Sequence, residues 1–348
     1  MSATDLVAVV LLLLLAAYTC GGGADFGAGI WDLLAGGRYR GEGPRSLVDY
    51  AMAPVWEANN VWLVFVLVVT WTGFPVVFEA VMSTTWAAVV LAALGLVLRG
   101  AAFAVRKPST GVVRRWRLGL VFGVASLLTP YFLGSVLGGV ASGRVPPGNR
   151  QGDPVTSWLN PTSALFGMVG VVAAAFIGAT FLVSDARRFG TPDLEIYFRR
   201  RSVASAGLLV LLMGVGLPVV HHDAKRLYDG LTAGWGLTFA VIAGVGLVAT
   251  ALLVNRNHLR GTRVLPTAAV AALVLAWGFA QRPFALPTSL TIDQAAGDPT
   301  TMRWLVGVIA VAVVLIGPAL ALLYRLDTTE RLTADHDEDL VEAPAGTP

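Results

Sequence analysis

The sequence predicts an all-α polytopic membrane protein, and three observations lead to that prediction. Only 14% of the 348 residues are charged and 55% are hydrophobic, whereas about 25% of the residues in a soluble domain are charged. Long apolar runs recur along the chain, each close to the roughly 20 residues that a helix needs to cross a bilayer. The 39 glycines indicate close helix packing through small residues.

Counting the apolar runs gives about nine transmembrane helices. Their expected limits are 6–34, 57–81, 84–105, 118–141, 161–183, 203–220, 235–254, 265–281 and 303–324. The sixth and eighth runs are the shortest, so an eight-span arrangement that omits one of them stays open. The first run follows Asp5 rather than a basic segment, which indicates a retained helix and not a cleaved secretory signal.

The distribution of basic residues predicts how the helices are oriented. One set of connections, together with the C-terminal tail, holds 18 of the 25 lysines and arginines, and the opposite set holds 6. Because cytoplasmic loops are enriched in Lys and Arg, we expect the N-terminus outside and the C-terminus in the cytoplasm. Residues 1–326 then form one transmembrane domain. The tail 327–348, with seven acidic residues and one arginine, is predicted to be disordered.

Ionisable residues inside membrane spans are costly, so each of them is a candidate functional residue. Asp25 lies in the cytoplasmic half of the first span, about 28 Å along a helix from Leu6. Glu57 begins the second span and Arg99 lies late in the third, so the three groups are expected at a similar depth. Asp32 follows Asp25 at i+7, on much the same face, and is expected at the membrane interface.

Two interpretations of these charges stay open. In the structural interpretation, Asp25 or Glu57 forms an ion pair with Arg99 and fastens neighbouring helices together. In the functional interpretation, the carboxylates take up protons from the cytoplasm and pass them inward, and the amides after Glu57, such as Asn59, hydrogen-bond within the cluster. Glu79 lies at the outer end of the second span, where a role at the interface suits it better.

Gly23 and Gly27 have the GxxxG spacing on either side of Asp25, which lets a neighbouring helix approach closely. We expect this approach to bring polar partners or water to the acid.

The four histidines are at positions 221, 222, 258 and 336, and none is expected at mid-membrane. A haem needs axial ligands such as His, Met or Cys directed at the iron. The single cysteine, Cys20, also excludes an internal disulfide. We therefore expect no cofactor and no metal to be bound by this chain on its own. The sequence contains no phosphate-binding loop, and no nucleic-acid partner is expected.

Segments near both ends of the chain resemble subunit II of the cytochrome bd-type quinol oxidases. The segments "GADFGAGIWDLL", "MAPVWEANNVWLVFVLVVTWTGFP" and "VLRGAAFAVR" resemble the first three helices of that family. The segment "RPFALPTSLTIDQAAGDPTTMRWLVGV" resembles its last outer loop and closing helix, and 142–282 is matched mainly by hydropathy. The pattern W-[DE]-x-N-x-V-W within the second segment is quite specific.

The resemblance implies two four-helix bundles plus a peripheral helix in a bacterial plasma membrane. It implies a partner, subunit I, which carries haems b and d, oxidises quinol and reduces oxygen to water. The protons would come from the cytoplasm, so the reaction would be electrogenic without pumping. Subunit II would carry no haem and no catalytic residue. Membrane lipid, quinone and a small accessory subunit complete the expected partners.

The resemblance also assigns roles to single residues. Asp25 corresponds to the acid of the family's first-helix pattern, Glu57 to the acid of its Trp-acid pair on a proton route, and Arg99 to the arginine that ends the third helix. We therefore expect a proton pathway through Asp25, Glu57, Asn59 and Arg99. Trp62 corresponds to a tryptophan at a lateral entrance for oxygen, so an oxygen path is expected there.

Two positions depart from the family pattern. Gly22 stands where the family often has a second acid, and Glu57 follows Trp56 where aspartate is usual, which moves the carboxyl by one methylene. Two other classes of protein stay open. In a proton-coupled secondary transporter, the same charges would form a substrate or ion site on a broken helix, and "CGGGAD" would be the break. In a purely structural membrane scaffold the acids would have no function.

Overall fold

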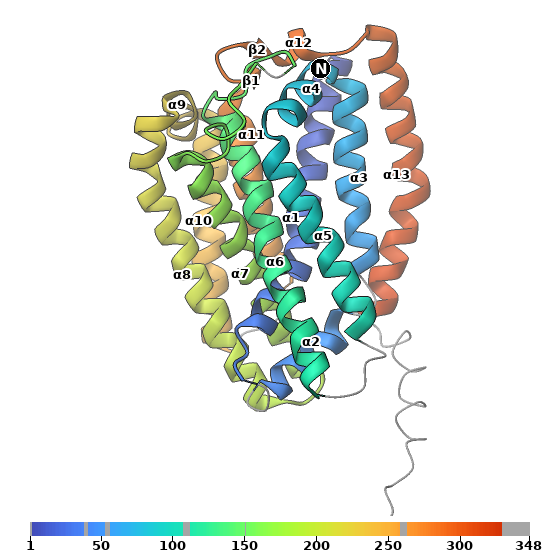
Figure 1. The fold of residues 1–348 in the computed structure, drawn as a ribbon, viewed down its shortest axis with the longest axis vertical. Coiled ribbons are helices and arrows are strands. Elements are labelled where there is room, and N and C mark those ends of the chain that lie inside the picture. Colours follow the sequence, from blue (N-terminus) through green and yellow to red (C-terminus); the bar gives the residue numbers. More distant parts are fainter. Residues whose placement is uncertain are drawn as a thin grey trace, which may run out of the picture.

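The structure is a computed structural model, and it describes residues 2–37, 41–52, 56–106, 112–149, 151–257 and 263–328. The long helices run side by side along the longest axis of the molecule, and short elements collect at its two ends (Figure 1). Within these ranges eight helices are long and apolar enough to cross a membrane, and the count reaches nine if one bent pair is a single span. The predicted all-α polytopic fold is therefore confirmed.

The helices form two bundles of four, as the resemblance implied. The first bundle consists of α1 (Ala3–Leu33), α3 (Trp56–Gly73), α5 (Trp86–Arg106) and α6 (Val112–Ala141). The second consists of α7 (Pro161–Arg188), α8 (Pro192–Asp223), α10 (Gly234–Asn255) and α11 (Val264–Gln281). Helix α7 packs against both α1 and α6 and so joins the bundles. Helix α13 (Pro299–Thr328) is peripheral, because it packs mainly against α1 and α3 and leaves most of its surface exposed.

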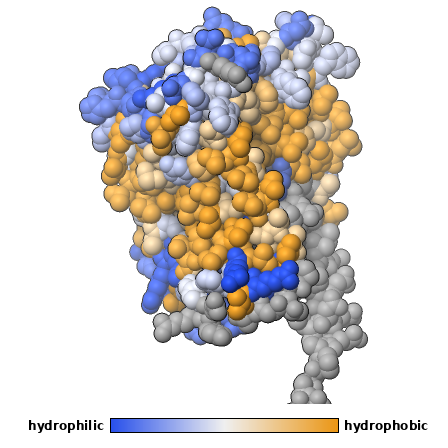
Figure 2. Space-filling view, in the orientation of Figure 1, coloured by the Kyte–Doolittle hydropathy of each residue, from blue (hydrophilic) through white to orange (hydrophobic). Residues whose placement is uncertain are grey.

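The surface has the hydropathy pattern of a membrane protein. On the face shown in Figure 2, hydrophobic residues cover a broad central band and hydrophilic residues gather at the two ends. Large apolar side chains such as Val97, Leu211 and Val245 are more than half exposed, at 68%, 57% and 64%. An exposed apolar surface of this extent is suited to lipid or a protein partner and not to water.

The predicted second span, 57–81, is not one straight helix. Helix α3 ends at Gly73, and α4 (Pro75–Thr84) starts after a bend of 118°. Phe74 has φ −133° and ψ 62°, outside the helical region, because the residue before a proline is disfavoured there and Pro75 supplies no N–H. The Gly73 carbonyl at the break accepts a hydrogen bond of 2.8 Å from the Gly297 amide.

The first span, in contrast, is continuous where a break was suggested. Helix α1 runs unbroken from Ala3 to Leu33, through the "CGGGAD" sequence. Glycines are tolerated inside a membrane helix where neighbouring helices pack closely against them. Residues 3–33 therefore do not contain the break that the alternative of a transporter suggested.

Helix limits differ most for the sixth predicted span, 203–220. Helix α8 begins at Pro192 because its first turn has a proline at its start and the acids Asp193 and Glu195, all favourable at a helix N-terminus. Hydropathy detects only the apolar part of such a helix. Helix α13 likewise continues to Thr328. The rest of the acidic tail, 329–348, lies outside the described residues, so its predicted disorder stays a prediction.

Short elements occupy the connections at both ends of the bundles. Helix α2 (Glu42–Met52) lies in the connection after α1, and its Leu47 and Val48 are buried in the core. At the opposite end lie α4, α9 (Lys225–Leu231) and α12 (Ile292–Ala295), with the antiparallel strands β1 (Phe284–Leu286) and β2 (Leu290–Thr291) (Figure 1). The sequence did not predict these short elements.

Candidate functional site

The centre of the candidate site is a hydrogen bond between α1 and α3. Asn59 Nδ2 donates to Asp25 Oδ2 at 2.7 Å and to the Gly21 carbonyl at 3.1 Å. Both side chains are buried, with 8% of Asp25 and 4% of Asn59 exposed. Asp25 lies in the half of α1 nearer to α2, about 12 Å along the helix from Leu33. The structure therefore brings together two of the residues predicted for a proton pathway.

Arg99 lies in the same region but does not form an ion pair with Asp25. Its Nε donates to Ser126 Oγ at 3.1 Å, and Ser126 in turn donates to the Phe122 carbonyl at 2.7 Å. The guanidinium carbon lies 5.0 Å from the ring centroid of Phe26 and 5.1 Å from that of Phe122, within cation–π range.

One nitrogen of this guanidinium, Arg99 Nη2, is buried and has no hydrogen-bond partner among the described residues. The charges of Asp25 and Arg99 act on each other through space without contact. The ion pair that the structural interpretation expected between these two residues is not formed. The Glu57 side chain lies outside the described residues, so its expected pairing with Arg99 stays a prediction.

The glycines around Asp25 serve two different contacts. Gly23 and Gly27 face α7, and a Cβ atom at Gly27 would lie 2.0 Å from the Ala174 carbonyl oxygen. The expected close approach of a helix is therefore present. The amide partner of Asp25 comes from α3 and not from α7, and the water that was expected beside the acid stays a prediction. Gly21 makes room there, since a Cβ atom at Gly21 would lie 2.7 Å from Asn59 Oδ1.

Asp32 is buried inside the fold, with 1% of its surface exposed, in the last turn of α1. Its expected depth at the membrane interface stays a prediction. Arg45 Nε of α2 donates to Asp32 Oδ1 at 3.0 Å, and Arg106 of α5 donates to Asp32 Oδ2. Arg106 also pairs with Asp49 of α2 at 3.2 Å. Asp32 is buried because α2 packs back over the end of the first bundle. Ion pairs on both of its oxygens hold the Asp32 carboxyl in place, so this cluster suits a fixed clamp.

His221, His222 and the single cysteine lie among the described residues. His221 and His222 are exposed at the end of α8, where they were expected, and their rings are 5.3 Å apart. The Cys20 thiol donates to the Thr267 carbonyl at 3.4 Å. His258 and His336 lie outside the described residues. No group of three or more His, Cys, Asp or Glu residues in the described ranges could hold a metal ion.

Comparison with known proteins identifies the family. The family model described as "Cytochrome bd terminal oxidase subunit II" matches residues 3–327, which is most of the chain. The chain belongs to this family.

Individual relatives agree with that assignment. The chain is 26% identical to "Cytochrome bd-I ubiquinol oxidase subunit 2" of Escherichia coli (strain K12), over 87% of this chain and 89% of the relative. It is 21% identical to "Putative cytochrome bd menaquinol oxidase subunit II" of Bacillus subtilis (strain 168), with the same coverage. The bd oxidase structure from Geobacillus thermodenitrificans shares the fold, with a TM-score of 0.72 over 94% of this chain and 98% of that chain at 24% identity.

The other predicted site residues of this bd-type oxidase subunit lie at different depths. Trp62, on α3, is half-buried and packs against the core cluster that contains Tyr18 and Phe26. Glu79 is exposed on α4, at the end of the molecule opposite α2. Glu57 lies in the first turn of α3. The structure thus gathers Asp25, Asn59 and Arg99 and keeps Glu79 apart.

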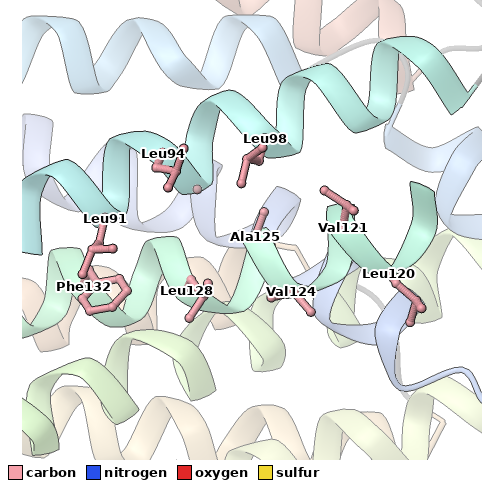
Figure 3. Close-up of a pocket in the computed structure, with 10 residues that line it drawn as sticks. Leu91, Leu94, Leu98, Leu120, Val121, Val124, Ala125, Leu128 and Phe132 are labelled. Atoms are coloured by element: carbon pink, nitrogen blue, oxygen red, sulfur yellow. The ribbon is translucent and has the colours of Figure 1, made fainter. Parts of the chain in front are cut away.

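The subunit also has an apolar groove between α5 and α6, with a volume of about 340 Å³. Figure 3 shows that aliphatic side chains from both helices line it. The lining residues are Leu91, Leu94, Gly95, Leu98, Leu120, Val121, Val124, Ala125, Leu128 and Phe132. None of the predicted proton-pathway or oxygen-path residues lines this groove.

Sequence reasoning missed Ser126, which binds Arg99, and Arg45, which binds Asp32. It also missed Asp49, which pairs with Arg106 beside Asp32. A serine on α6 has no sequence signal that distinguishes it from other small residues in a span. Arg45 and Asp49 carried a usable signal, because they flank the buried Leu47 and Val48 in an amphipathic segment.

Proposed function

We propose that this chain is the haem-free subunit II of a bd-type quinol oxidase in a bacterial plasma membrane. It would support a haem-bearing subunit I, which oxidises quinol and reduces oxygen to water. The family membership and the shared fold support this assignment. When bound in the complex, the haems would supply the electron-transfer and oxygen chemistry, and the N-terminus of this chain would face outward.

The proposed role of this chain's own residues is to deliver protons. Asp25 is buried, and among the described residues its carboxyl accepts from the neutral amide of Asn59 and forms no ion pair. A carboxyl group in this state can exchange a proton more readily than one held between two arginines, as Asp32 is. This contrast between the two acids is the observation that carries the proposal.

The direction of the route follows from the helix positions. Glu57 lies in the first turn of α3, two residues before Asn59, at the end of the bundle where α2 lies with its Arg45. Protons would enter there, pass Glu57 and reach Asp25, where Asn59 orients the carboxyl and Arg99 limits the build-up of positive charge. Proton entry from the cytoplasm and release of quinol protons outside would make turnover electrogenic without pumping. Oxygen would enter laterally near Trp62.

A proton-coupled secondary transporter remains the second candidate function, but no specific observation favours it. Helix α1 is unbroken at Asp25. Among the described spans, the bend that exceeds 40° lies at Gly73–Pro75, far along α3 from Asn59.

The first experiment is purification in mild detergent through a C-terminal tag, followed by a reduced-minus-oxidised visible spectrum. Co-purification of b- and d-type haem bands with a second hydrophobic polypeptide is expected. A colourless, solitary polypeptide, from cells that express the neighbouring subunits, would favour the transporter.

The proton route is tested in the same preparation with Asp25→Asn and Glu57→Gln. Each should lower quinol oxidase turnover by about a hundredfold, the lower range for a positioned acid–base group, while the haem spectrum stays intact. Glu79→Gln is the matched control, because Glu79 is an exposed acid on α4. Wild-type turnover in Asp25→Asn would refute the proton role and leave the subunit assignment standing.

A further inference from the structure

Tyr18 is a buried tyrosine that the proposed function does not use. It lies on α1 with 5% of its surface exposed, and its hydroxyl has no hydrogen-bond partner among the described residues. Buried hydroxyl groups are nearly always hydrogen-bonded, to protein or to an ordered water. An unpartnered hydroxyl inside a membrane helix bundle therefore indicates a polar site that the described part of this chain does not complete.

The ring of Tyr18 lies along α1 in the direction of Asp25. A Cβ atom at Gly22 would lie 3.1 Å from Tyr18 Cε2 and 3.4 Å from Phe26 Cε2, so both rings lie over Gly22. The Tyr18 and Phe26 rings meet edge to face, with centroids 6.4 Å apart. Because Gly22 has no side chain, the phenol can extend one helical turn toward the carboxyl of Asp25.

Arg99 approaches the same place from α5. Its guanidinium lies over the Phe26 ring, which the Tyr18 ring also contacts, and its Nη2 is the second buried polar atom here without a partner. The charges of Arg99 and Asp25 both act on the Tyr18 hydroxyl. The Tyr18 hydroxyl, the Asp25 carboxyl and the Arg99 guanidinium therefore lie in the same part of the bundle, near the Phe26 ring.

The chemistry of the two unpartnered groups is complementary through water. A guanidinium N–H can only donate, whereas a phenol hydroxyl can donate or accept. A buried water requires two to four polar partners and a polar site. One water would accept a hydrogen bond from Arg99 Nη2 and donate one toward the Asp25 carboxylate. The same water would either donate a hydrogen bond to Tyr18 Oη or accept one from it.

We propose that Tyr18 is a positioning residue of the Asp25 site, and that its hydroxyl and Arg99 Nη2 together hold an ordered water beside Asp25. The functional part of this inference rests on the proposed proton role of Asp25. The water extends the polar site beyond Asn59, along α1 in the direction of its N-terminus. Proton exchange at Asp25 would then depend on the Tyr18 hydroxyl, although Tyr18 itself need not change its protonation state.

The direct test is a high-resolution cryo-EM map of the complete oxidase. The wild-type map should contain density for a water within hydrogen-bond distance of both Tyr18 Oη and Arg99 Nη2. In Tyr18→Phe, which keeps the ring over Gly22 and removes only the hydroxyl, the density should be lost. The inference is overturned if these two atoms contact protein groups in the wild-type map with no water between them.

Turnover gives an independent readout. Tyr18→Phe should lower quinol oxidase turnover about two- to tenfold, as expected for the loss of one hydrogen bond. Tyr197→Phe is the matched control, because Tyr197 lies on α8 and its hydroxyl is likewise buried and unpartnered in the described part of the chain. The control should retain wild-type turnover.

The outcomes separate this inference from the proposed function. Normal turnover in Asp25→Asn, together with water density in the wild-type map, would refute the proton role of Asp25 and support the water site. A second outcome is a large loss of turnover in Asp25→Asn together with wild-type turnover and unchanged water density in Tyr18→Phe. That outcome would support the proton role of Asp25 and refute the proposed role of Tyr18.

Discussion

Gly27 of α1 and Gly178 of α7 lie backbone against backbone where the two bundles meet. A Cβ atom at Gly27 would lie 2.9 Å from Gly178 Cα, and a Cβ atom at Gly178 would lie 2.6 Å from the Gly27 carbonyl carbon. Both distances are shorter than the contacts that real Cβ atoms make. The atoms on the other side belong to the backbone, so they cannot rotate away as a side chain would. The junction between the bundles therefore depends on glycine at both positions.

Gly27→Ala should weaken this junction. The added methyl would force α1 and α7 apart at the centre of the molecule, and overpacking of this kind costs about 1–3 kcal/mol. We expect a lower melting temperature of the purified complex in detergent. Gly214→Ala on α8 is the control, because nothing lies within 4 Å of a Cβ atom there. A Gly27→Ala complex that melts with the wild type would contradict the close packing.

Much of the fold could be predicted because lipid restricts the backbone to a few solutions. Backbone groups inside the bilayer must be satisfied within each helix, so apolar runs report spans directly. The bend at Phe74 had a local signal in Pro75, but a hydropathy window averages across it. Helix α2 is amphipathic and lies in a polar connection, so no apolar run reveals it.

The candidate site was predicted only in part. Asp25, Asn59 and Arg99 stand out because polar groups in spans are rare, and the structure brings them together. The partner of Arg99 did not stand out, because Ser126 is 27 residues away and belongs to another helix. The burial of Asp32 depends on how α2 folds back, which one-dimensional spacing does not determine.

Asp32→Asn should destabilise the end of the first bundle where α2 lies. The substitution keeps the shape of the side chain but removes the charge that Arg45 and Arg106 share. Removing one partner of a buried ion pair costs about 3–5 kcal/mol, because a buried charge loses its compensation. Here Arg45 loses its carboxylate, whereas Arg106 keeps its pair with Asp49. We expect a lower melting temperature and faster proteolysis of the connection that contains α2.

The control for this clamp is Arg115→Gln. Arg115 is 56% exposed and lies 3.8 Å from Asp49, so its loss should cost at most about 1 kcal/mol. Equal melting temperatures for the Asp32 and Arg115 variants would mean that the clamp adds nothing to stability.

Asn59→Leu should affect turnover more than stability. A hydrogen bond between membrane helices contributes only about 0.6–2 kcal/mol to stability, so the complex should still assemble. The carboxyl of Asp25 would lose its amide donor. Because a hydrogen bond to a charged group contributes about 1.5–3 kcal/mol, we expect turnover to fall about ten- to hundredfold. The measurement is quinol oxidase turnover beside a melting curve.

Thr70→Val is the control for Asn59, because the Thr70 hydroxyl on the same helix bonds only to the Val66 carbonyl, at 2.6 Å. Its turnover should match the wild type. If Asn59→Leu also keeps full turnover, Asn59 does not orient a proton-carrying Asp25.

Asp223 should matter for stability at the end of the molecule opposite α2. It accepts hydrogen bonds from Arg144 at 2.5 and 3.0 Å, and from the Thr162 amide and hydroxyl at 3.1 and 2.6 Å. These contacts join α8 to the first turn of α7 and to the connection after α6. Asp223→Ala should therefore lower stability by about 2–4 kcal/mol, because a charge-assisted network and a favourable helix N-terminal charge are lost together.

Asp229→Ala is the control, because it removes an exposed pair with Lys225 and should cost only about 0.3–0.5 kcal/mol. Thermal unfolding of the two variants side by side checks this difference, and equal midpoints would show that the Asp223 contacts do not hold the connection in place.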